Sequence, residues 1–336
     1  MACRSGSNRI EFNCLEHPLR VSGLWVMSLV LVLGACSPGE ADLDLRGWEP
    51  LIAVANPIDD SVGVLAWPTS GLNVAFLQLL LAGEGVETTS VGPPDGTALS
   101  LGWHAAGEQL LLEYSPELGS STPSRFAVLD RSGTVVGEIV PSVEGSGGFG
   151  VLAVEPGGDY FVWSAQAPGE TDEPADLWKV DLESGEAQRL TDTGGVAERW
   201  PRFVDSEIIV YLAGIATFEF GRDNGWIEAL DLESGEKRRM TPEDQVVLSL
   251  DVDPTGRWVI YSAYSGDDRS QTAIWYVDAR NVDEPRLLVE RAVQRVSTSH
   301  DGRRILIQRA GGRPGDVGSV TWVDVPDDAP WLAISR

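Results

Sequence analysis

The sequence predicts an all-β protein, a six-bladed β-propeller of four-stranded antiparallel blades, and three observations predict it. The hexapeptide Asp-Leu-Glu-Ser-Gly-Glu occurs at residues 181–186 and again at 231–236, fifty residues later. A second kind of turn, followed by a short apolar strand, recurs six times at intervals of 47, 51, 48, 50 and 46 residues. With 37 glycines and 20 prolines, the chain has many turn residues and almost no long runs of helix formers. Such a period, with four short strands per unit, is typical of a propeller.

The N-terminal region is interpreted as a leader. Arg20 precedes an apolar run at residues 21–33, which is shorter than the roughly 20 residues needed to span a bilayer. The run ends Leu-Gly-Ala-Cys, which resembles the lipobox of bacterial lipoproteins and implies that the Cys36 thiol is acylated. Residues 1–36 are therefore expected to be a lipoprotein signal peptide, and residues 37–48 a flexible tether. An ordinary secretory signal or an N-terminal anchor helix is the alternative.

The repeated hexapeptide has the chemistry of a tight hairpin. Gly185 and Gly235 would take the left-handed conformation, and the Asp and Ser side chains would bond to the local backbone. In both copies a strand with an aromatic residue comes before the hairpin, and a strand ending in threonine follows it. These hairpins are expected to join the two outer strands of a blade.

The second turn marks the start of each unit. The predicted blades cover residues 49–92, 97–140, 148–191, 197–241, 245–289 and 292–335. Residues 331–335 are expected to supply the last strand of the sixth blade, so that no blade shares strands from both ends of the chain. The alternatives are a β-sandwich, a β-helix and a solenoid. Sandwiches do not repeat in sequence, and a period near fifty is too long for one β-helix rung.

Two of the repeats resemble a known family. Residues 253–262 (Asp-Pro-Thr-Gly-Arg-Trp-Val-Ile-Tyr-Ser) and 299–306 are similar to the Ser-Pro-Asp-Gly-Lys-x-Ile-x-Phe repeat of TolB-like (WD40-like, PD40) propellers. The resemblance covers residues 95–325, and the full Ser-Pro-Asp-Gly motif occurs nowhere in the chain. It implies the fold, whereas propellers of this type act as scaffolds, peptidase gates and ligand binders alike.

Composition excludes some partners. The chain has 51 acidic and 25 basic residues and a net charge of −26, so it would repel nucleic acid and anionic lipid. No cysteine follows Cys36, which excludes a disulfide or a cysteine-based metal site in the propeller.

Few residues suggest catalysis. Of the three histidines, only His104 and His300 lie after the predicted leader. The chain has neither an H-E-x-x-H nor a G-x-S-x-G motif. Asp251 with Asp253, and the acidic cluster at 170–176, offer oxygen ligands for calcium without EF-hand spacing. No other cofactor is expected, and the acidic pairs also fit the general abundance of carboxylates.

The longest predicted loops share one face. If the strands of a blade are named a to d from the channel outwards, the a–b and c–d turns lie on one face and the b–c and d–a loops on the other. The predicted b–c loops are residues 115–124, 164–176, 213–225, 262–272 and 309–318. Large aromatic and arginine residues assigned to this face are candidate partner-binding residues: Trp200, Arg202, Arg295, Phe218 and Arg222. The alternative is that Trp200 packs between blades and that the arginines pair with carboxylates.

These observations favour a non-catalytic binding or scaffolding propeller that engages another envelope protein or a peptide through its loop-rich face. The Cys36 anchor would hold it on the outer membrane facing the periplasm, or on the outer leaflet of the cytoplasmic membrane. The rival is a metal-assisted lyase or a lactonase-like hydrolase, which would need carboxylates or histidines from several blades in the channel. A degenerate structural propeller is a third possibility.

Overall fold

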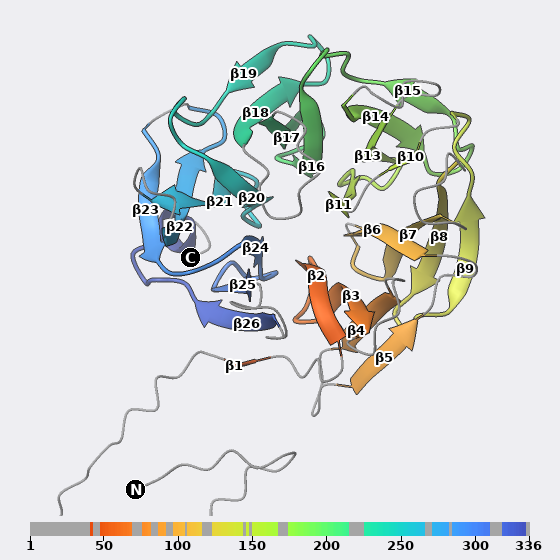
Figure 1. Cartoon of the computed structure of the whole chain (residues 1–336), viewed down its shortest axis with the longest axis horizontal. Helices are drawn as coiled ribbons and strands as arrows, with labels where there is room; N and C mark the ends of the chain where they lie inside the picture. Colours follow the sequence, from red (N-terminus) through yellow and green to blue (C-terminus); the bar gives the residue numbers. More distant parts are fainter. Residues whose placement is uncertain are drawn as a thin grey trace, which may run out of the picture. The chain divides into compact units, whose positions relative to one another are not determined.

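The strands form six antiparallel blades around a ring (Figure 1). The computed structural model describes residues 41–42, 48–68, 76–81, 87–91, 97–104, 106–115, 123–143, 146–147, 150–166, 174–214, 225–265, 271–281, 284–309 and 318–333. All of them belong to the unit Gly39–Arg336. The six-bladed propeller is confirmed. None of the helices in these ranges has the length and apolar character needed to cross a membrane.

Blades one to five follow the chain from an inner strand a to an outer strand d, and blade six has its strands a to c in the same order. The strands are, for blade one, β2 (Trp48–Ala55), β3 (Val62–Pro68), β4 (Phe76–Leu81) and β5 (Glu87–Val91); for blade two, β6 (Thr97–Trp103), β7 (Gln109–Ser115), β8 (Arg125–Asp130) and β9 (Val135–Ile139); for blade three, β12 (Ala153–Val154), β13 (Tyr160–Gln166), β14 (Asp176–Asp181) and β15 (Ala187–Arg189); for blade four, β16 (Ala197–Phe203), β17 (Ile208–Gly214), β18 (Gly225–Asp231) and β19 (Lys237–Arg239); for blade five, β20 (Val247–Val252), β21 (Trp258–Ser265), β22 (Gln271–Asp278) and β23 (Arg286–Glu290); and for blade six, β24 (Arg295–Thr298), β25 (Arg304–Arg309) and β26 (Ser319–Asp324).

Two further short strands connect blades two and three. The strand β10 (Ser146–Gly147) pairs with β13, and β11 (Gly150–Val151) pairs in parallel with β6 of the preceding blade.

Blade six closes the ring in a way that the sequence did not predict. Its outer strand is β1 (Ala41–Asp42), which pairs antiparallel with β26 (Figure 1). The prediction that residues 331–335 supply this strand is wrong, because Pro330–Ala333 form a 3₁₀ helix, η1. Trp331 is 1% exposed in this helix, and its indole Nε1 donates to the carbonyl oxygen of Gly302 at 2.8 Å. Packing of Trp331 therefore holds Pro330–Ala333 away from the open edge of blade six. Ala41–Asp42, which belong to the predicted tether, pair with that edge instead.

The repeated hexapeptides form the predicted hairpins between strands c and d. In the first copy, the Asp181 carboxylate accepts hydrogen bonds from the backbone N–H and the hydroxyl of Ser184, both at 2.7 Å, and Gly185 has a φ of 72°. The second copy, residues 231–236, repeats these contacts at 2.7 and 2.9 Å. In both copies the serine N–H, and then its hydroxyl, hold the pKa of the Asp carboxyl below its usual value.

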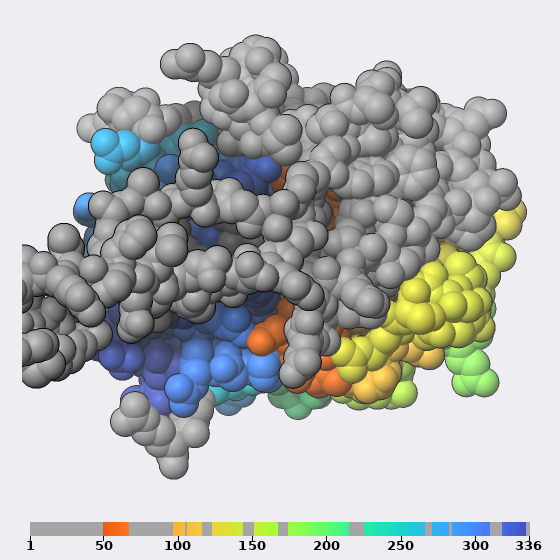
Figure 2. Space-filling view, turned by 90° about the horizontal axis from the view of Figure 1, so that it is seen from below, coloured from red at the N-terminus to blue at the C-terminus, as the bar shows by residue number. Residues whose placement is uncertain are grey.

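The core lies between the blades. Six hydrophobic clusters each join one pair of neighbouring blades. One of them packs Val64 of blade one against Trp322 of blade six, and Figure 2 shows the C-terminal residues in blue beside the first blade in orange. Because both faces of a central strand meet another blade, the b strands β7 and β17 are buried at all but their first residue.

Candidate functional site

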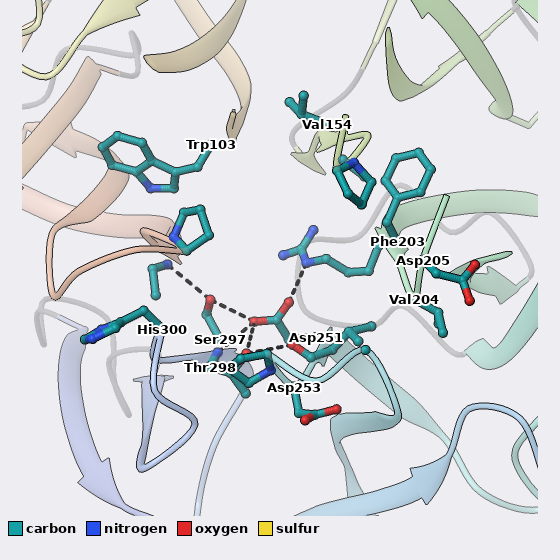
Figure 3. Close-up of a pocket in the computed structure, with 18 of the residues that line it drawn as sticks. Trp103, Val154, Phe203, Val204, Asp205, Asp251, Asp253, Ser297, Thr298 and His300 are labelled. Atoms are coloured by element: carbon teal, nitrogen blue, oxygen red, sulfur yellow. Dashed lines mark hydrogen bonds and ion pairs between the residues drawn. The ribbon is translucent and has the colours of Figure 1, made fainter. Parts of the chain in front are cut away.

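A hollow lined by described residues lies where the inner strands end. Residues at the ends of the a strands, and a–b turn residues of every blade but blade two, surround a cavity of about 770 Å³, which we call the central funnel (Figure 3). Its apolar wall includes Val54, Trp103 and Phe203, and its polar wall includes Glu155, Arg202, Asp251, Ser297 and Thr298. The volume is that of an ordinary ligand pocket.

Asp251 is the centre of a hydrogen-bond network that crosses the funnel wall (Figure 3). Arg202 Nε of blade four donates to Asp251 Oδ1 of blade five at 2.7 Å, and the two side chains are 12% and 11% exposed. The other oxygen, Oδ2, accepts from the Thr298 N–H at 2.7 Å and from the hydroxyls of Thr298 and Ser297, each at 3.0 Å. The Ser297 hydroxyl in turn accepts from the N–H of Ala55 at 3.1 Å. Four blades are thus tied together around one carboxylate.

Arg202 and Glu155 retain hydrogen-bonding capacity towards the funnel. Arg202 donates through Nη1 to the carbonyl oxygen of Pro201 at 3.0 Å, and its Nη2 has no acceptor among the described residues. Glu155 is 7% exposed, and its buried Oε2 receives no hydrogen bond from any described residue. Buried polar atoms are nearly always paired, so Glu155 Oε2 marks where a ligand could complete the pairing, and Arg202 Nη2 could donate to the same ligand.

A β-bulge directs Arg202 into the funnel. The pairing of β16 with β17 shifts between Arg199 and Arg202, and Trp200 within the bulge has a φ of 59°. A left-handed conformation is uncommon for a bulky residue, and such conformations cluster at functional sites. The bulge lets the Trp200 side chain enter the core between blades four and five, while Arg202 turns towards the channel.

Among the described candidate partner-binding residues, Trp200 and Arg202 do not share one exposed rim. Trp200 is 5% exposed and stacks under the guanidinium of Arg295, 4.3 Å from the ring centre. The placement predicted for Arg202 on the loop-rich face is wrong, because Arg202 lies near the end of β16, beside the a–b turn on the opposite face. Phe218, Arg222 and the acylation site Cys36 lie outside the described residues.

The described residues among the proposed calcium ligands have other contacts. Asp253 caps its own turn by accepting hydrogen bonds from the N–H groups of Thr255, Arg257 and Trp258. Asp176, the last residue of the acidic cluster, pairs with Arg189. Within the described ranges, no group of three or more His, Cys, Asp or Glu residues is arranged to hold a metal ion.

Glu155 was missed as a site residue because its sequence context is only that of a turn. The residue starts the a–b turn of blade three, and its backbone makes the turn hydrogen bonds with Gly158 and Tyr160. At the same point of blades five and six, Asp253 and Ser299 use their side chains to cap the turn, and in blade four the next residue, Asp205, does so. The Glu155 side chain makes no such bond to a described residue, and only its burial in the three-dimensional structure distinguishes it.

No protein-family model and no curated protein sequence matches the chain. Among solved structures, it is similar to the crystal structure of TolB from Acinetobacter baumannii, with a TM-score of 0.55 and 14% identity over 86% of this chain and 65% of that one. It is also similar to a putative TolB from Agrobacterium tumefaciens (TM-score 0.51, 16% identity, 83% and 90% of the two chains). A third similar structure is an oligogalacturonate lyase in complex with manganese, with a TM-score of 0.54 and 10% identity over 84% of this chain and 91% of that one.

These likenesses show the β-propeller fold. The chain spans less than two thirds of the Acinetobacter protein. Because the neighbours include both TolB proteins and a lyase, the fold fits a binding module and an enzyme equally.

Proposed function

We propose that this protein is a lipid-anchored, non-catalytic binding module of the bacterial cell envelope, which holds a peptide segment of another envelope protein in the central funnel. The observation that carries the proposal is the pair of groups left facing the funnel, the Arg202 guanidinium and the Glu155 carboxylate. A peptide supplies both complements, a carbonyl or carboxylate oxygen for the arginine and an N–H or cationic group for the glutamate.

The role of Asp251 also favours binding over catalysis. Its two oxygens accept four hydrogen bonds from the protein itself, so it fixes Arg202 and the inner strand of blade six. A guanidinium held through Nε keeps its terminal N–H groups in a defined direction, which lowers the entropic cost of binding a ligand there.

Photo-crosslinking in intact cells tests the funnel as the binding site. A photoreactive amino acid at Ser206, an exposed residue that lines the funnel, is expected to capture a specific partner. The same amino acid at Ser234, exposed in a c–d hairpin of the same blade, is the matched control and is expected to capture none. Equal capture at the two positions, or none at Ser206, would refute the proposal.

A change that removes the charge but keeps the size of the side chain tests Glu155 in the same assay. Glu155→Gln is expected to lower partner affinity about tenfold, or about 1.4 kcal/mol, because an amide replaces the carboxylate. Asp159→Asn removes the same charge from an exposed position of the same turn, outside the funnel lining, and should leave capture unchanged. If the two variants behave alike, Glu155 does not contact the ligand.

The lipid anchor is tested separately. Cys36→Ala is expected to abolish labelling by a fatty-acid probe and to release the protein from the membrane fraction, because the multiple acyl chains of a lipoprotein supply most of the membrane affinity. A variant with Cys14→Ala, in the same leader, should remain labelled. Equal labelling of wild type and Cys36→Ala would contradict the assignment.

A further inference from the structure

The protein repeatedly covers its own tryptophan rings with arginine. In blade three, Arg189 on the outer strand is in register with Trp178 on strand c, and its guanidinium lies 5.9 Å from the ring centre. Arg189 also pairs with two carboxylates, Asp176 and Asp192, the latter at 3.1 Å. The cation is thus held between an aromatic ring and acidic groups, which is a favourable arrangement for a guanidinium.

Blade five has the same tryptophan without the arginine. Trp275 stands three residues before the aspartate that ends strand c, as Trp178 does in blade three. Its register partner on the outer strand is Leu287, in the place of Arg189. The six cation–π contacts of the described residues include none over Trp275.

A groove of about 560 Å³ opens beside Trp275 instead. Its apolar wall is formed by Trp275, Tyr264 and Leu287, the last of which is 44% exposed. Its charged lining consists of three carboxylates, Asp244, Glu284 and Glu290, and no Lys, Arg or His from the described ranges lines it.

The indole of Trp275 carries a second sign of a missing partner. Its Nε1 is buried and has no hydrogen-bond acceptor among the described residues, whereas Nε1 of Trp178 donates to the carbonyl oxygen of Ala165 at 3.3 Å. A buried donor without an acceptor is unfavourable, and a backbone carbonyl oxygen of a segment entering the groove would relieve it, whereas a guanidinium only donates.

We infer that this groove binds an arginine side chain of a partner protein, which takes the place that Arg189 occupies in blade three. The guanidinium would stack on the Trp275 ring, with the Glu284 and Glu290 carboxylates as its ion-pair partners. Arginine fits better than lysine because its planar guanidinium stacks on an aromatic ring and is more weakly hydrated than an ammonium group, so its desolvation costs less free energy. The inference is independent of the funnel, since no residue lines both cavities.

The test uses the full chain and the tripeptide acetyl-Gly-Arg-Gly-amide, with its neutral isostere acetyl-Gly-citrulline-Gly-amide as control. The indole N–H signal of Trp275, assigned through Trp275→Phe, is followed by NMR as each peptide is added. We expect the arginine peptide to shift this signal with a dissociation constant on the order of 1 mM, and the citrulline peptide to bind at least tenfold more weakly. Equal binding of the two peptides would overturn the inference.

Variants of the groove sharpen the test. Leu287→Arg rebuilds the arrangement of blade three and is expected to abolish binding, whereas Leu287→Gln, a neutral change at the same exposed site, is expected to preserve it. The double change Glu284→Gln with Glu290→Gln should weaken binding about tenfold. If Leu287→Arg still binds the peptide fully, the groove is not the site. If Arg269→Ala, outside the described residues, binds tenfold more tightly than wild type, the chain itself competes for the groove and the partner role is wrong.

Discussion

Replacing Gly185 by alanine is expected to lower the free energy of unfolding by about 3 kcal/mol, whereas the same change at Gly235 should cost about 1 kcal/mol. The two glycines occupy the same position of identical hexapeptides, with φ values of 72° and 73°. Both alanines would therefore suffer the same left-handed backbone strain. Only at Gly185 would the new Cβ also meet another atom, the carbonyl oxygen of Val140 at 2.5 Å.

The difference reports on the contact between blades two and three. The Gly185 carbonyl accepts a hydrogen bond from the N–H of Ser142 at 2.8 Å, and the Ser142 hydroxyl accepts one from the N–H of Ala187 at 2.9 Å. At Gly235 nothing lies within 4 Å of the added Cβ. Denaturant unfolding of the two variants gives the comparison directly, from the shift of the midpoint at constant slope. Equal losses of unfolding free energy in the two variants would mean that the hairpin at 181–186 is not in tight contact with blade two.

The blades were predictable because their signals are local. Each a–b turn and each c–d hairpin is specified by a few consecutive residues, such as Asp181 and Ser184, whose side chains bond to the turn they form. These turns repeat at the period of the blade, so their spacing locates the strands between them. The predicted start of blade two at residue 97 and that of blade four at residue 197 coincide with the observed strands.

The closure and the site depend on contacts between distant segments, which leave no such signal. Nothing in the repeat marks Ala41 and Asp42 as a strand, because they pair only after β26 presents an open edge. The bulge in β16 breaks the alternation of inward and outward side chains, so Trp200 and Arg202 cannot be assigned to faces from their spacing. The partner of Arg202 lies 49 residues further along the chain.

Asp251→Ala is expected to be the most destabilising single change in the funnel, with a loss of about 3–5 kcal/mol in the free energy of unfolding. It would leave the Arg202 guanidinium, only 12% exposed, without its carboxylate. It would also leave the N–H of Thr298 and the hydroxyl of Ser297 without that acceptor, whereas the Thr298 hydroxyl could still donate to the carbonyl oxygen of Val252. Each buried donor left unpaired adds to the cost of the lost ion pair.

A matched control separates this network from ordinary surface charge. Arg280→Ala removes the pair with Asp205, whose side chains are 63% and 32% exposed, and should cost at most about 1 kcal/mol. A double-mutant cycle with Arg202→Met and Asp251→Ala should show a coupling of about 2 kcal/mol, because once the carboxylate is gone the unpaired guanidinium is itself unfavourable. Both quantities come from denaturant unfolding. Additive losses, or a loss for Asp251→Ala no greater than for Arg280→Ala, would show that the four blades are held together by apolar packing alone.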